Sequence, residues 1–538
     1  MNSITEECYK INPEWVSPTL DVLESKPMDN KRTPKILIKH SRIEVSDYDI
    51  GDAPRLEYLF SVWDPIYHTS FPKAIEYNPD TKKLVVPRGM NINTLKETFY
   101  AEPEVDRKPD PFVDSDPLPI KYLTKDERQM EILKFILGED KYAYTRTKSQ
   151  ISVNSTTGSG KTFVTVAAIC FTGARAIIIT SSKNWLEQWK ARILEYTALS
   201  EKDIYMIIGK PQLDKLLARD PLQYQIFLAS HSTIKSYGDR AGWDKVEDLF
   251  KYLQCSIKIF DEAHLYFDNM AKIDYHSNTR KTLYLTATPE RSNKDEDIVY
   301  QEYFRNVPSI ELFDEKIDPH VNYWSILYQS HPSPYDIQNY SRGQFKFDRN
   351  VYTAYLVDRP NFLKLVTILI DMTLPINGKV LIYIGTNDAI LKVYNYIISE
   401  FPFLKDHVSI YTSITDSANK EVALTKKYIL STTKSCGAAS DIRDLAVTIV
   451  LAEPFKSPVV ARQTLGRCRA DNTLYIDCTD ISCYRTKLYN KQKKSTFLQY
   501  AKSCRETFLD DGELLMRYEN VKHKYRTKKV MCMRVWKE

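Results

Sequence analysis

A loop of small residues between an apolar strand and a helix constrains the fold of this chain more than any other stretch of its sequence. Residues 155–162 read STTGSGKT; they follow the apolar segment QISVN and open the apolar segment KTFVTVAAICF. In this context a loop can turn its backbone N–H groups inward around phosphate oxygens at the N-terminus of a helix. Gly158 and Gly160 give the backbone the freedom that this turn requires. The loop therefore predicts a nucleoside triphosphate site on an α/β domain.

The other residues of this loop suit the same ligand. Lys161 can reach the β- and γ-phosphates, and the Thr162 hydroxyl can ligate Mg²⁺. Ser155 stands where such loops usually begin with Gly, and its small side chain should still let the loop close. The predicted ATP-binding residues of the loop are Ser155, Thr156, Thr157, Gly158, Ser159, Gly160, Lys161 and Thr162.

Two adjacent carboxylates follow an apolar strand about a hundred residues further on. In the segment IKIFDEAH, Asp261 can hold Mg²⁺ while Glu262 orients and polarises the attacking water. A surface acidic turn would not explain why the pair follows a buried strand at this distance from the loop. Lys161 and Glu262 are therefore predicted to be catalytic in the hydrolysis of ATP, with Thr162 and Asp261 as the Mg²⁺ ligands.

Apolar strand candidates alternate with helical stretches over most of the chain. The first series is QISVN, ARAIIIT, YQIFLAS, SIKIFDE and KTLYLTATP. The second series is NYWSILYQ, KVLIYIG, HVSIYTS, KYILSTT, VTIVLAE and TLYIDC. Short apolar strands separated by helices favour parallel sheets with helices on both faces. The pattern predicts an α/β protein with two such domains in tandem.

The length of 538 residues exceeds what one hydrophobic core can organise, so several domains are expected. A Pro- and Asp-rich stretch at 108–119 is typical of a linker. We expect a small mixed α+β N-terminal domain with its linker at 1–117, the first α/β domain at 118–305 and the second at 306–485. A basic C-terminal extension is expected at 486–538.

The net charge of +5 is unevenly distributed. From Arg485 to Glu538 the chain carries 15 Lys and Arg against 6 Asp and Glu, which makes this end strongly basic. A basic segment favours a polyanionic partner such as nucleic acid, although a solvated tail would have the same composition.

The nine cysteines are scattered, which indicates a reducing compartment, and we expect a cytoplasmic protein. Cys478, Cys483, Cys504 and His523 could in principle form a metal site. Their spacing matches no common zinc pattern, so free thiols are the simpler expectation. No apolar run is long enough for a membrane span, and the first residues do not resemble a signal peptide.

Four segments in order, TTGSGKT, DEAH, LTATPER and QTLGRCR, resemble the motifs of superfamily 2 helicases and translocases. Within that superfamily the chain is most similar to the XPB-type and phage UvsW-like group. The TAT triplet, the QTLGR segment and the small N-terminal domain carry this similarity. The resemblance implies two RecA-like domains, ATP and Mg²⁺ as cofactors, and DNA as a partner bound without sequence specificity.

The resemblance also implies roles for individual residues. It gives Gln129 the recognition of adenine and Asp441 a place in the ATP site, although Ala439 stands where the family has Gly. The implied nucleic-acid contacts are Ser181, Ser182, Ser230, Thr233 and Thr386. The residues implied to couple the ATP state to strand binding are His264, Thr286 and Thr288.

An arginine must reach the γ-phosphate as negative charge develops there, because its fork of donors suits phosphate and stays charged. Arg467 and Arg469 are the candidates, and Gln463 of the same motif is a further catalytic candidate. The family places its second Arg one position later, where this chain has Ala470. Which arginine acts stays open.

The resemblance implies an ATP-dependent DNA helicase or translocase that acts on duplex or branched DNA in replication, recombination or repair. An RNA helicase and the motor subunit of a restriction or defence complex are the alternatives. Trp63, Tyr67 and Tyr77 of the N-terminal domain could stack on bases, but packing in the core is the simpler expectation for them.

Overall fold

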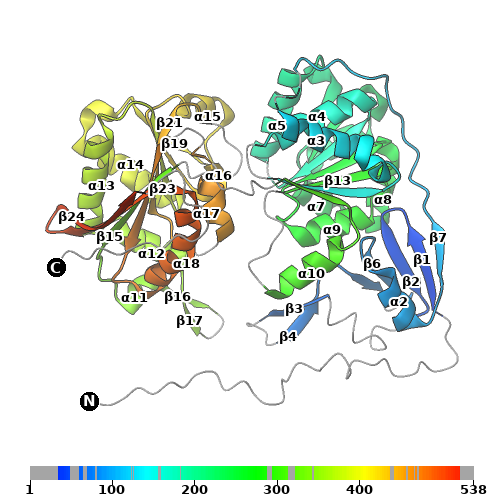
Figure 1. Cartoon of the computed structure of the whole chain (residues 1–538), viewed down its shortest axis with the longest axis horizontal. Helices are drawn as coiled ribbons and strands as arrows, with labels where there is room; N and C mark the ends of the chain where they lie inside the picture. The colour runs from blue at the N-terminus through cyan, green and yellow to red at the C-terminus, as the bar shows by residue number, and fades with distance from the viewer. Residues whose placement is uncertain are drawn as a thin grey trace, which may run out of the picture. The chain divides into compact units, whose positions relative to one another are not determined.

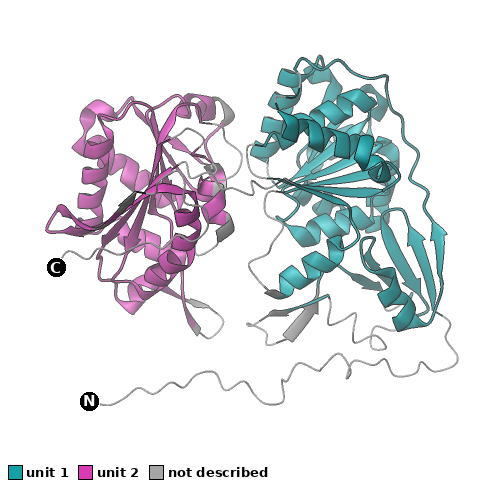
Figure 2. Ribbon diagram, viewed as in Figure 1, with its two compact units in different colours: residues 1–313 teal, residues 314–538 magenta. Residues whose placement is uncertain are grey.

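The computed structural model of the chain comprises two compact units, residues 1–313 and residues 314–538 (Figures 1 and 2). The residues that the structure describes are 34–48, 60–64, 69–78, 81–122, 124, 126–155, 159–181, 183–286, 294–312, 321–341, 344–412, 414–436, 442–455, 458–465, 467–468 and 472–521. None of the helices in this described part has the length and apolar character needed to span a bilayer.

A small mixed sheet forms the N-terminal part of the first unit (Figure 1). Its strands, in spatial order, are β5 (Glu76–Asn78), β6 (Lys83–Pro87), β2 (Arg42–Ser46), β1 (Lys35–Lys39) and β7 (Pro103–Asp106). The β1–β7 pair is parallel and the other pairs are antiparallel. Helix α2 (Ile92–Phe99) and the hairpin of β3 (Ser61–Asp64) and β4 (Thr69–Pro72) complete this part.

This N-terminal part shares one hydrophobic core with the α/β domain that follows it. Buried side chains of the small sheet belong to the same cluster as side chains of α8 (Trp243–Leu253), α9 (Phe267–Tyr275) and α10 (Lys294–Phe304). At Gly89 the two parts approach so closely that a Cβ would lie 2.3 Å from the backbone oxygen of Tyr303. His276 adds polar contacts, because its ring nitrogens lie 2.9 Å from a carboxylate oxygen of Glu76 and 3.0 Å from one of Glu247.

The Pro- and Asp-rich stretch predicted to be a linker is bound along the first α/β domain. We call residues 110–121 the strap. Backbone N–H groups at five of its positions donate to the domain at 2.8–3.2 Å, accepted by the carbonyl oxygens of Asn278, Gln254, Gly173, Cys170 and Tyr196. Three of these acceptors lie near the amino-terminal ends of the strands, on the edge of the sheet opposite to the phosphate loop.

A seven-stranded parallel sheet is the centre of the first unit. Its strands, in spatial order, are β10 (Ile204–Ile207), β11 (Ile226–Ser230), β9 (Ala176–Thr180), β12 (Ile257–Asp261), β13 (Lys281–Thr286), β8 (Gln150–Ser155) and β14 (Ser309–Leu312). All five strands expected here from the sequence are present. The four-residue strands β10 and β14 at the two edges were not anticipated.

Helices cover both faces of this sheet, so that its strands are apolar on both sides. They are α3 (Glu127–Leu137), α4 (Lys161–Thr172), α5 (Lys183–Tyr196), α6 (Gly209–Leu217), α7 (His231–Ala241), α8 (Trp243–Leu253), α9 (Phe267–Tyr275) and α10 (Lys294–Phe304), with short 3-10 helices at Asp140–Thr145, Glu201–Asp203 and Pro221–Gln223. Ile178 of β9 faces the core under α3, α4 and α5, whereas Ile177 and Ile179 face the core under the later helices.

The second unit is built on an eight-stranded sheet. Its strands, in spatial order, are β19 (Val408–Tyr411), β20 (Tyr428–Ser431), β18 (Lys379–Ile384), β21 (Leu445–Ala452), β22 (Thr473–Asp480), β15 (Val321–Tyr328), β23 (Ala501–Asp510) and β24 (Glu513–Val521). Only the β23–β24 pair is antiparallel. The six strands expected from the sequence are all present.

The helices of the second unit again lie on both faces of its sheet. They are α11 (Pro334–Ile337), α12 (Arg349–Leu356), α13 (Pro360–Thr373), α14 (Asn387–Glu400), α15 (Ser417–Ala423), α16 (Thr433–Cys436), α17 (Pro458–Leu465) and α18 (Tyr484–Tyr500), with a 3-10 helix at Pro402–Leu404. A small hairpin of β16 (Gln338–Ser341) and β17 (Gln344–Phe347) precedes α12.

The region assigned from its charge to a basic extension is largely part of this sheet. Helix α18 packs against β22, and the β23–β24 hairpin adds two strands beside β15 (Figure 1). Residues 522–538 lie outside the described residues. The chain is thus an α/β protein with two RecA-like parallel-sheet domains and a small mixed N-terminal sheet.

Candidate functional site

The parallel strands of the first unit bring the predicted ATP-binding residues to one edge of the sheet. β13 lies between β8 and β12, and all three run in the same direction. Thr286 at the end of β13 pairs with Asn154 of β8, and Leu285 pairs with Asp261 of β12. The phosphate loop, the acidic pair and the TAT segment therefore leave the sheet side by side.

The phosphate loop is held by short contacts between its two ends. The Lys161 ammonium group donates to the backbone oxygen of Ser155 at 2.7 Å, and the hydroxyls of Ser155 and Ser159 lie 2.8 Å apart. Burial lowers the pKa of Lys161, while the negative charges of Glu262 and Asp261 act to raise it. Thr156, Thr157 and Gly158 lie outside the described residues.

Gly160 is the point at which this loop enters α4. Its φ of 88° lies in the left-handed region, where a side chain would strain the backbone. A Cβ there would also lie 2.4 Å from the Gln129 side-chain nitrogen. Gln129 is therefore placed directly against the loop, as a residue that recognises the base of a bound nucleotide must be. Lys161 and Thr162 occupy the first turn of α4, with their side chains half-buried.

The Asp261 carboxylate is held by donors on both of its oxygens. The indole N–H of Trp189 donates to Oδ2 at 2.8 Å, and the backbone N–H of Glu262 donates to Oδ1 at 3.0 Å. Burial and the adjacent charge of Glu262 raise the pKa of Asp261 to about 6. The crowding of two carboxylates beside the Lys161 ammonium group is a setting in which a divalent cation gains much by binding.

A short polar chain joins the ends of β12 and β13. His264 Nδ1 lies 2.9 Å from the Thr286 hydroxyl and 3.3 Å from the Glu262 Oε2 atom. Glu262 adopts a left-handed backbone conformation with φ of 49°, which turns the chain sharply after the strand. Glu262, predicted to be catalytic, thus lies close to His264, which contacts Thr286; the resemblance implies a coupling role for both His264 and Thr286. Thr288 lies outside the described residues.

The predicted strand contacts in the first unit are less directly placed. Ser230 caps α7 by accepting from the Thr233 backbone N–H at 3.2 Å, and the two hydroxyls lie 2.7 Å apart. Both side chains are buried. Ser181 is half-buried after β9, and Ser182 lies outside the described residues. Binding of nucleic acid by these residues stays a prediction.

In the second unit the structure describes part of the predicted set. Arg467 follows α17 and is buried, and Thr386 caps α14 by accepting from the Ala389 backbone N–H at 3.2 Å. Gln463 lies in α17, but its side chain is not among the described ones. Arg469 and Asp441 lie outside the described residues. The identity of the γ-phosphate arginine stays open.

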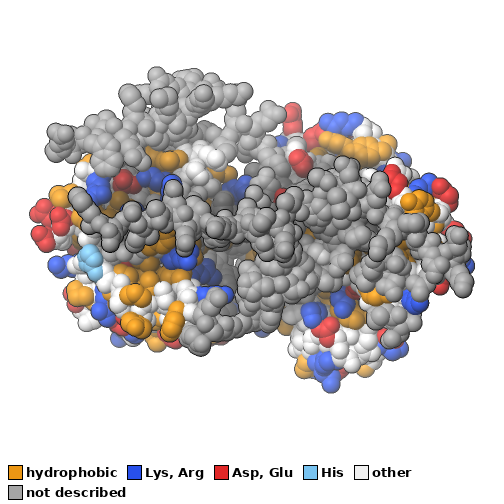
Figure 3. Space-filling view, turned by 90° about the horizontal axis from the view of Figure 1, so that it is seen from below, with side chains coloured by type: hydrophobic (Ala, Val, Ile, Leu, Met, Phe, Trp, Pro, Cys, Tyr) orange, Lys and Arg blue, Asp and Glu red, His pale blue; other side chains and the backbone are white. Residues whose placement is uncertain are grey.

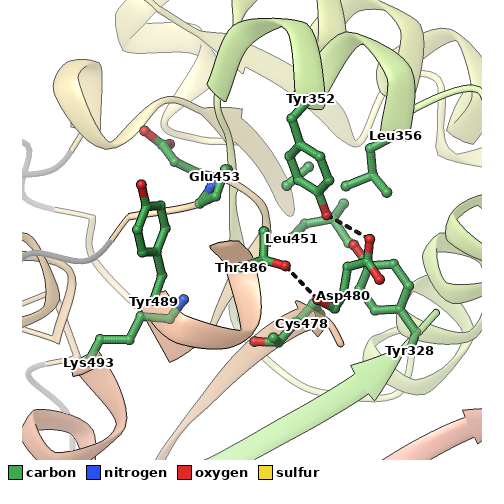
Figure 4. Close-up of a pocket in the computed structure, with 13 residues that line it drawn as sticks. Tyr328, Tyr352, Leu356, Leu451, Glu453, Cys478, Asp480, Thr486, Tyr489 and Lys493 are labelled. Atoms are coloured by element: carbon green, nitrogen blue, oxygen red, sulfur yellow. Dashed lines mark hydrogen bonds between the residues drawn. The ribbon is translucent and has the colours of Figure 1, made fainter. Parts of the chain in front are cut away.

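A pocket lies at the carboxyl edge of the second sheet, between α12 and α18 (Figure 4). Its polar side chains bind one another: the Tyr352 hydroxyl donates to Asp480 Oδ2 at 3.1 Å, and the Thr486 hydroxyl donates to the Asp480 backbone oxygen at 2.5 Å. Lys493 also borders the pocket and pairs with Asp477 at 2.7 Å. These groups need no ligand to satisfy them.

Three of the cysteines suggested as a conceivable metal site are described by the structure. Cys478, Cys483 and Cys504 are buried and form no disulfide with a described residue, and burial raises the pKa of Cys478. Within the described part of the chain, no group of three or more metal-ligating side chains is placed to hold an ion. His523 lies outside the described residues.

Of the three aromatic residues suggested to stack on bases, Tyr77 alone has a described side chain. Tyr77 is half-buried and its ring lies 6.4 Å from that of Tyr48, so that it packs within the N-terminal part. The side chain of Trp63 and all of Tyr67 lie outside what the structure describes. The contact of Trp189 with Asp261 was missed, because its helical spacing from Trp185 indicates only a buried face.

The first α/β domain is similar to a known protein family. Residues 123–291 match the family "Type III restriction enzyme, res subunit". A segment of 143 residues, 27% of this chain and 20% of the relative, is 27% identical to "Putative DNA 3'-5' helicase Rad25" of Haloarcula marismortui. Over 352 residues, 63% of this chain and 68% of the relative, the chain is 22% identical to "Transcript termination protein A18" of Yaba-like disease virus.

Among solved structures, S. cerevisiae Dbp5 bound to RNA and ADP BeF3 aligns with a TM-score of 0.50 at 13% identity, over 73% of this chain and 92% of that one. This likeness confirms the RecA-like fold. The matched motor region, the grouped motif residues and the likeness to Rad25 and A18 lead to one conclusion. The chain is related to the superfamily 2 helicases.

Proposed function

We propose that this protein is a DNA-dependent ATPase that translocates on DNA and remodels or unwinds duplex or branched structures. The observation that carries the proposal is the grouping of Lys161, Asp261, Glu262, His264 and Thr286 at one edge of the first sheet. The relative named as a DNA helicase matches 143 residues of this chain, and it favours DNA over RNA as the stimulating partner.

The chain's own groups suit each step of hydrolysis. Lys161 would hold the terminal phosphates, and Gln129 would read the base. Thr162 and Asp261 would hold Mg²⁺, which neutralises phosphate charge when it is bound. Glu262 would orient the attacking water, and an arginine of the second unit, Arg467 or Arg469, would stabilise the developing charge. His264 and Thr286 would transmit the change to the strand-binding loops.

The charge of α18 supports a polyanionic partner. The helix contains five basic residues and no acidic one. Lys493 and Lys494 pair with Asp477 and Glu506, but the exposed side chains of Arg485, Lys487 and Lys491 form no ion pair with another described residue. Arg485 and Lys487 also lie in the first turn, where the helix dipole disfavours cations. Bound nucleic-acid phosphates would supply the missing ion-pair partners and would offset the unfavourable interaction with the helix dipole.

Aromatic side chains of α18 and of the β16–β17 hairpin lie near the basic side chains of α18. The Tyr489 ring of α18 lies 6.0 Å from Phe347 of the β16–β17 hairpin, and Phe345 on that hairpin is exposed. Basic side chains lie among hydrophobic ones on the left half of the face shown in Figure 3. Such a mixture suits both the phosphates and the bases of a strand.

The similarity to A18 over 63% of this chain favours a second candidate function. A motor that moves along DNA could act in termination of transcription instead of recombination or repair. Both functions need the same DNA-stimulated ATPase, so the first experiment does not depend on the choice between them.

The test is the steady-state ATPase rate without nucleic acid and with single-stranded DNA, duplex DNA, a four-way junction or RNA. We expect strong stimulation by DNA, and loss of turnover in Lys161→Ala with DNA binding retained. Stimulation by RNA alone would assign the protein to the RNA helicases. Normal turnover in Lys161→Ala would refute the assigned ATP site.

A further inference from the structure

Trp189 joins two parts of the first unit that are far apart in the sequence. It lies on α5 with only 3% of its surface exposed, one helical turn after the buried Trp185. Its indole N–H donates to the Asp261 Oδ2 atom at 2.8 Å. Helix α5 begins at Lys183, directly after the predicted strand contacts Ser181 and Ser182. The bond therefore runs from a helix beside the predicted strand contacts to the acidic pair of the ATP site.

The choice of acceptor is what makes this bond informative. A buried indole N–H needs a partner, and a backbone carbonyl would satisfy it as well. Here the partner is a carboxylate whose other oxygen already accepts from the Glu262 backbone N–H. With one donor on each oxygen, the Asp261 carboxylate cannot turn about its own axis without losing a hydrogen bond. A bond to a charged acceptor is also stronger than one between neutral groups.

We propose that Trp189 is a positioning residue that fixes the orientation of the Asp261 carboxylate and ties it to the position of α5. This inference rests on the proposed ATP site. A bound nucleic-acid strand that shifts α5 would move the indole donor of Trp189, and with it the Asp261 carboxylate that is expected to hold Mg²⁺. The aromatic ring fills the core, whereas the N–H group sets the geometry of the site.

The test separates these two contributions of the tryptophan. Trp189→Phe keeps an aromatic ring and removes the donor, and Trp185→Phe on the same helix is the matched control. Binding of an ATP analogue that carries a fluorescent methylanthraniloyl group is measured in excess Mg²⁺ and in EDTA. The ratio of the two dissociation constants reports how well the site uses the metal, independently of turnover.

We expect Trp189→Phe to reduce this Mg²⁺-dependent tightening about tenfold, equivalent to about 1.4 kcal/mol. Binding in EDTA should stay within about twofold of the unsubstituted protein, because the phosphate loop is untouched. Trp185→Phe should behave like the unsubstituted protein in both conditions. An unchanged Mg²⁺ effect in Trp189→Phe would overturn the proposal.

A second comparison protects the test from a general loss of packing. Trp189→Phe is combined with Asp261→Asn, in which the metal-binding charge is already absent. If Trp189 acts through Asp261, the double variant should show the same Mg²⁺ effect as Asp261→Asn alone; a further loss would show that it acts by another route. If the unsubstituted protein bound the analogue no better than Lys161→Ala, the ATP site itself would be refuted.

Discussion

Both units bury a lysine–aspartate pair against their central sheets, but the two pairs are supported differently. In the first unit Lys258 of β12 pairs with Asp274 of α9 at 2.7 Å, and both side chains are fully buried. Asp274 also accepts from the hydroxyls of Tyr284 and Tyr303 at 2.6 and 2.7 Å and from the Gln150 amide at 2.9 Å. This carboxylate is the centre of a network that joins three strands and two helices.

The pair in the second unit has fewer partners. Lys493 of α18 lies 2.7 Å from Asp477 of β22, and the lysine side chain keeps 5% of its surface exposed. The other donors to Asp477 are the Asn490 amide at 3.1 Å and the Tyr323 hydroxyl at 3.5 Å. One pair thus binds the helix that follows the DEAH segment, and the other binds a helix near the C-terminal end. Similar chemistry secures α9, which follows the acidic pair, in one unit and α18 in the other.

Asp274→Asn should have the largest effect on stability. It leaves Lys258 without its counter-charge in the core, and burial already lowers the pKa of that lysine. Breaking a buried pair in this way costs about 3–5 kcal/mol. Hydrogen exchange of α9 and β12, followed by mass spectrometry, measures the loss locally. Exchange as slow as in the unsubstituted protein would show that the network does not depend on the charge.

Asp477→Asn is the matched change in the second unit and should cost less, about 2–3 kcal/mol. Lys493 can reach solvent more easily than Lys258, and its ammonium group lies 4.6 Å from the centre of the Phe455 ring. Faster exchange is expected in α18 and β22, with α9 unaffected. Equal losses for the two substitutions would remove the difference drawn between the pairs.

A partly exposed ion pair should contribute less again, and with a defined dependence on pH. Burial acts against the charge of His276, but hydrogen bonds to Glu247 and Glu76 raise its pKa above the ordinary value. A raised histidine pKa stabilises the folded state below the unfolded pKa of about 6.5, and the contribution disappears as pH rises through the folded pKa. His276→Gln should therefore cost about 1 kcal/mol at pH 6 and progressively less toward pH 9. Thermal unfolding across this range checks the trend; a cost independent of pH would contradict it.

The cations of α18 that pair with no described acidic residue should matter for binding and hardly at all for stability. Lys487→Glu combined with Lys491→Glu should change stability by about 0.5 kcal/mol or less. If these residues contact phosphates, the slope of log affinity for duplex DNA against log salt should flatten by about 2. Lys405→Glu, at an exposed site after the 3-10 helix that precedes β19, is the control. A slope that matches this control would favour a merely solvated helix. Removing everything after residue 485 is a poorer test, because it also removes Lys493 from Asp477.

Much of the fold could be predicted because buried parallel strands are short apolar runs. The apolar runs KVLIYIG and ARAIIIT can be assigned to buried strands from the sequence alone. The four-residue strands β10 and β14, by contrast, depend on pairing with a neighbouring strand. The DG pair is a local sequence signal for the β23–β24 hairpin: Asp511 and Gly512 have φ of 44° and 90°, as a tight turn requires. The net charge of this end of the chain does not reveal that Lys493 pairs with Asp477 and Lys494 with Glu506.

The candidate site was predictable where a motif fixes both residue type and local geometry. Lys161, Asp261 and Glu262 follow from the order of strand, loop and helix. The contact of Trp189 could not be predicted in the same way, since the Asp261 carboxylate that accepts its hydrogen bond lies 72 residues further along the chain. The predicted strand contacts Ser230 and Thr233 differ from these residues, because their hydroxyls already take part in the cap of α7. Their binding of nucleic acid stays a prediction.

The strap binds the N-terminal part to the first α/β domain through backbone hydrogen bonds. Its composition suggests a spacer into which residues can be inserted freely, yet a Cβ at Gly173 would lie 2.0 Å from the Ser115 carbonyl oxygen. An insertion there would throw several backbone hydrogen bonds out of step. When segments are exchanged between related proteins, the N-terminal part should therefore be transferred together with the strap and with the loops of the α/β domain that bind the strap. Hybrids joined within residues 110–121 should fold poorly, whereas hybrids joined between the two units should not carry this penalty.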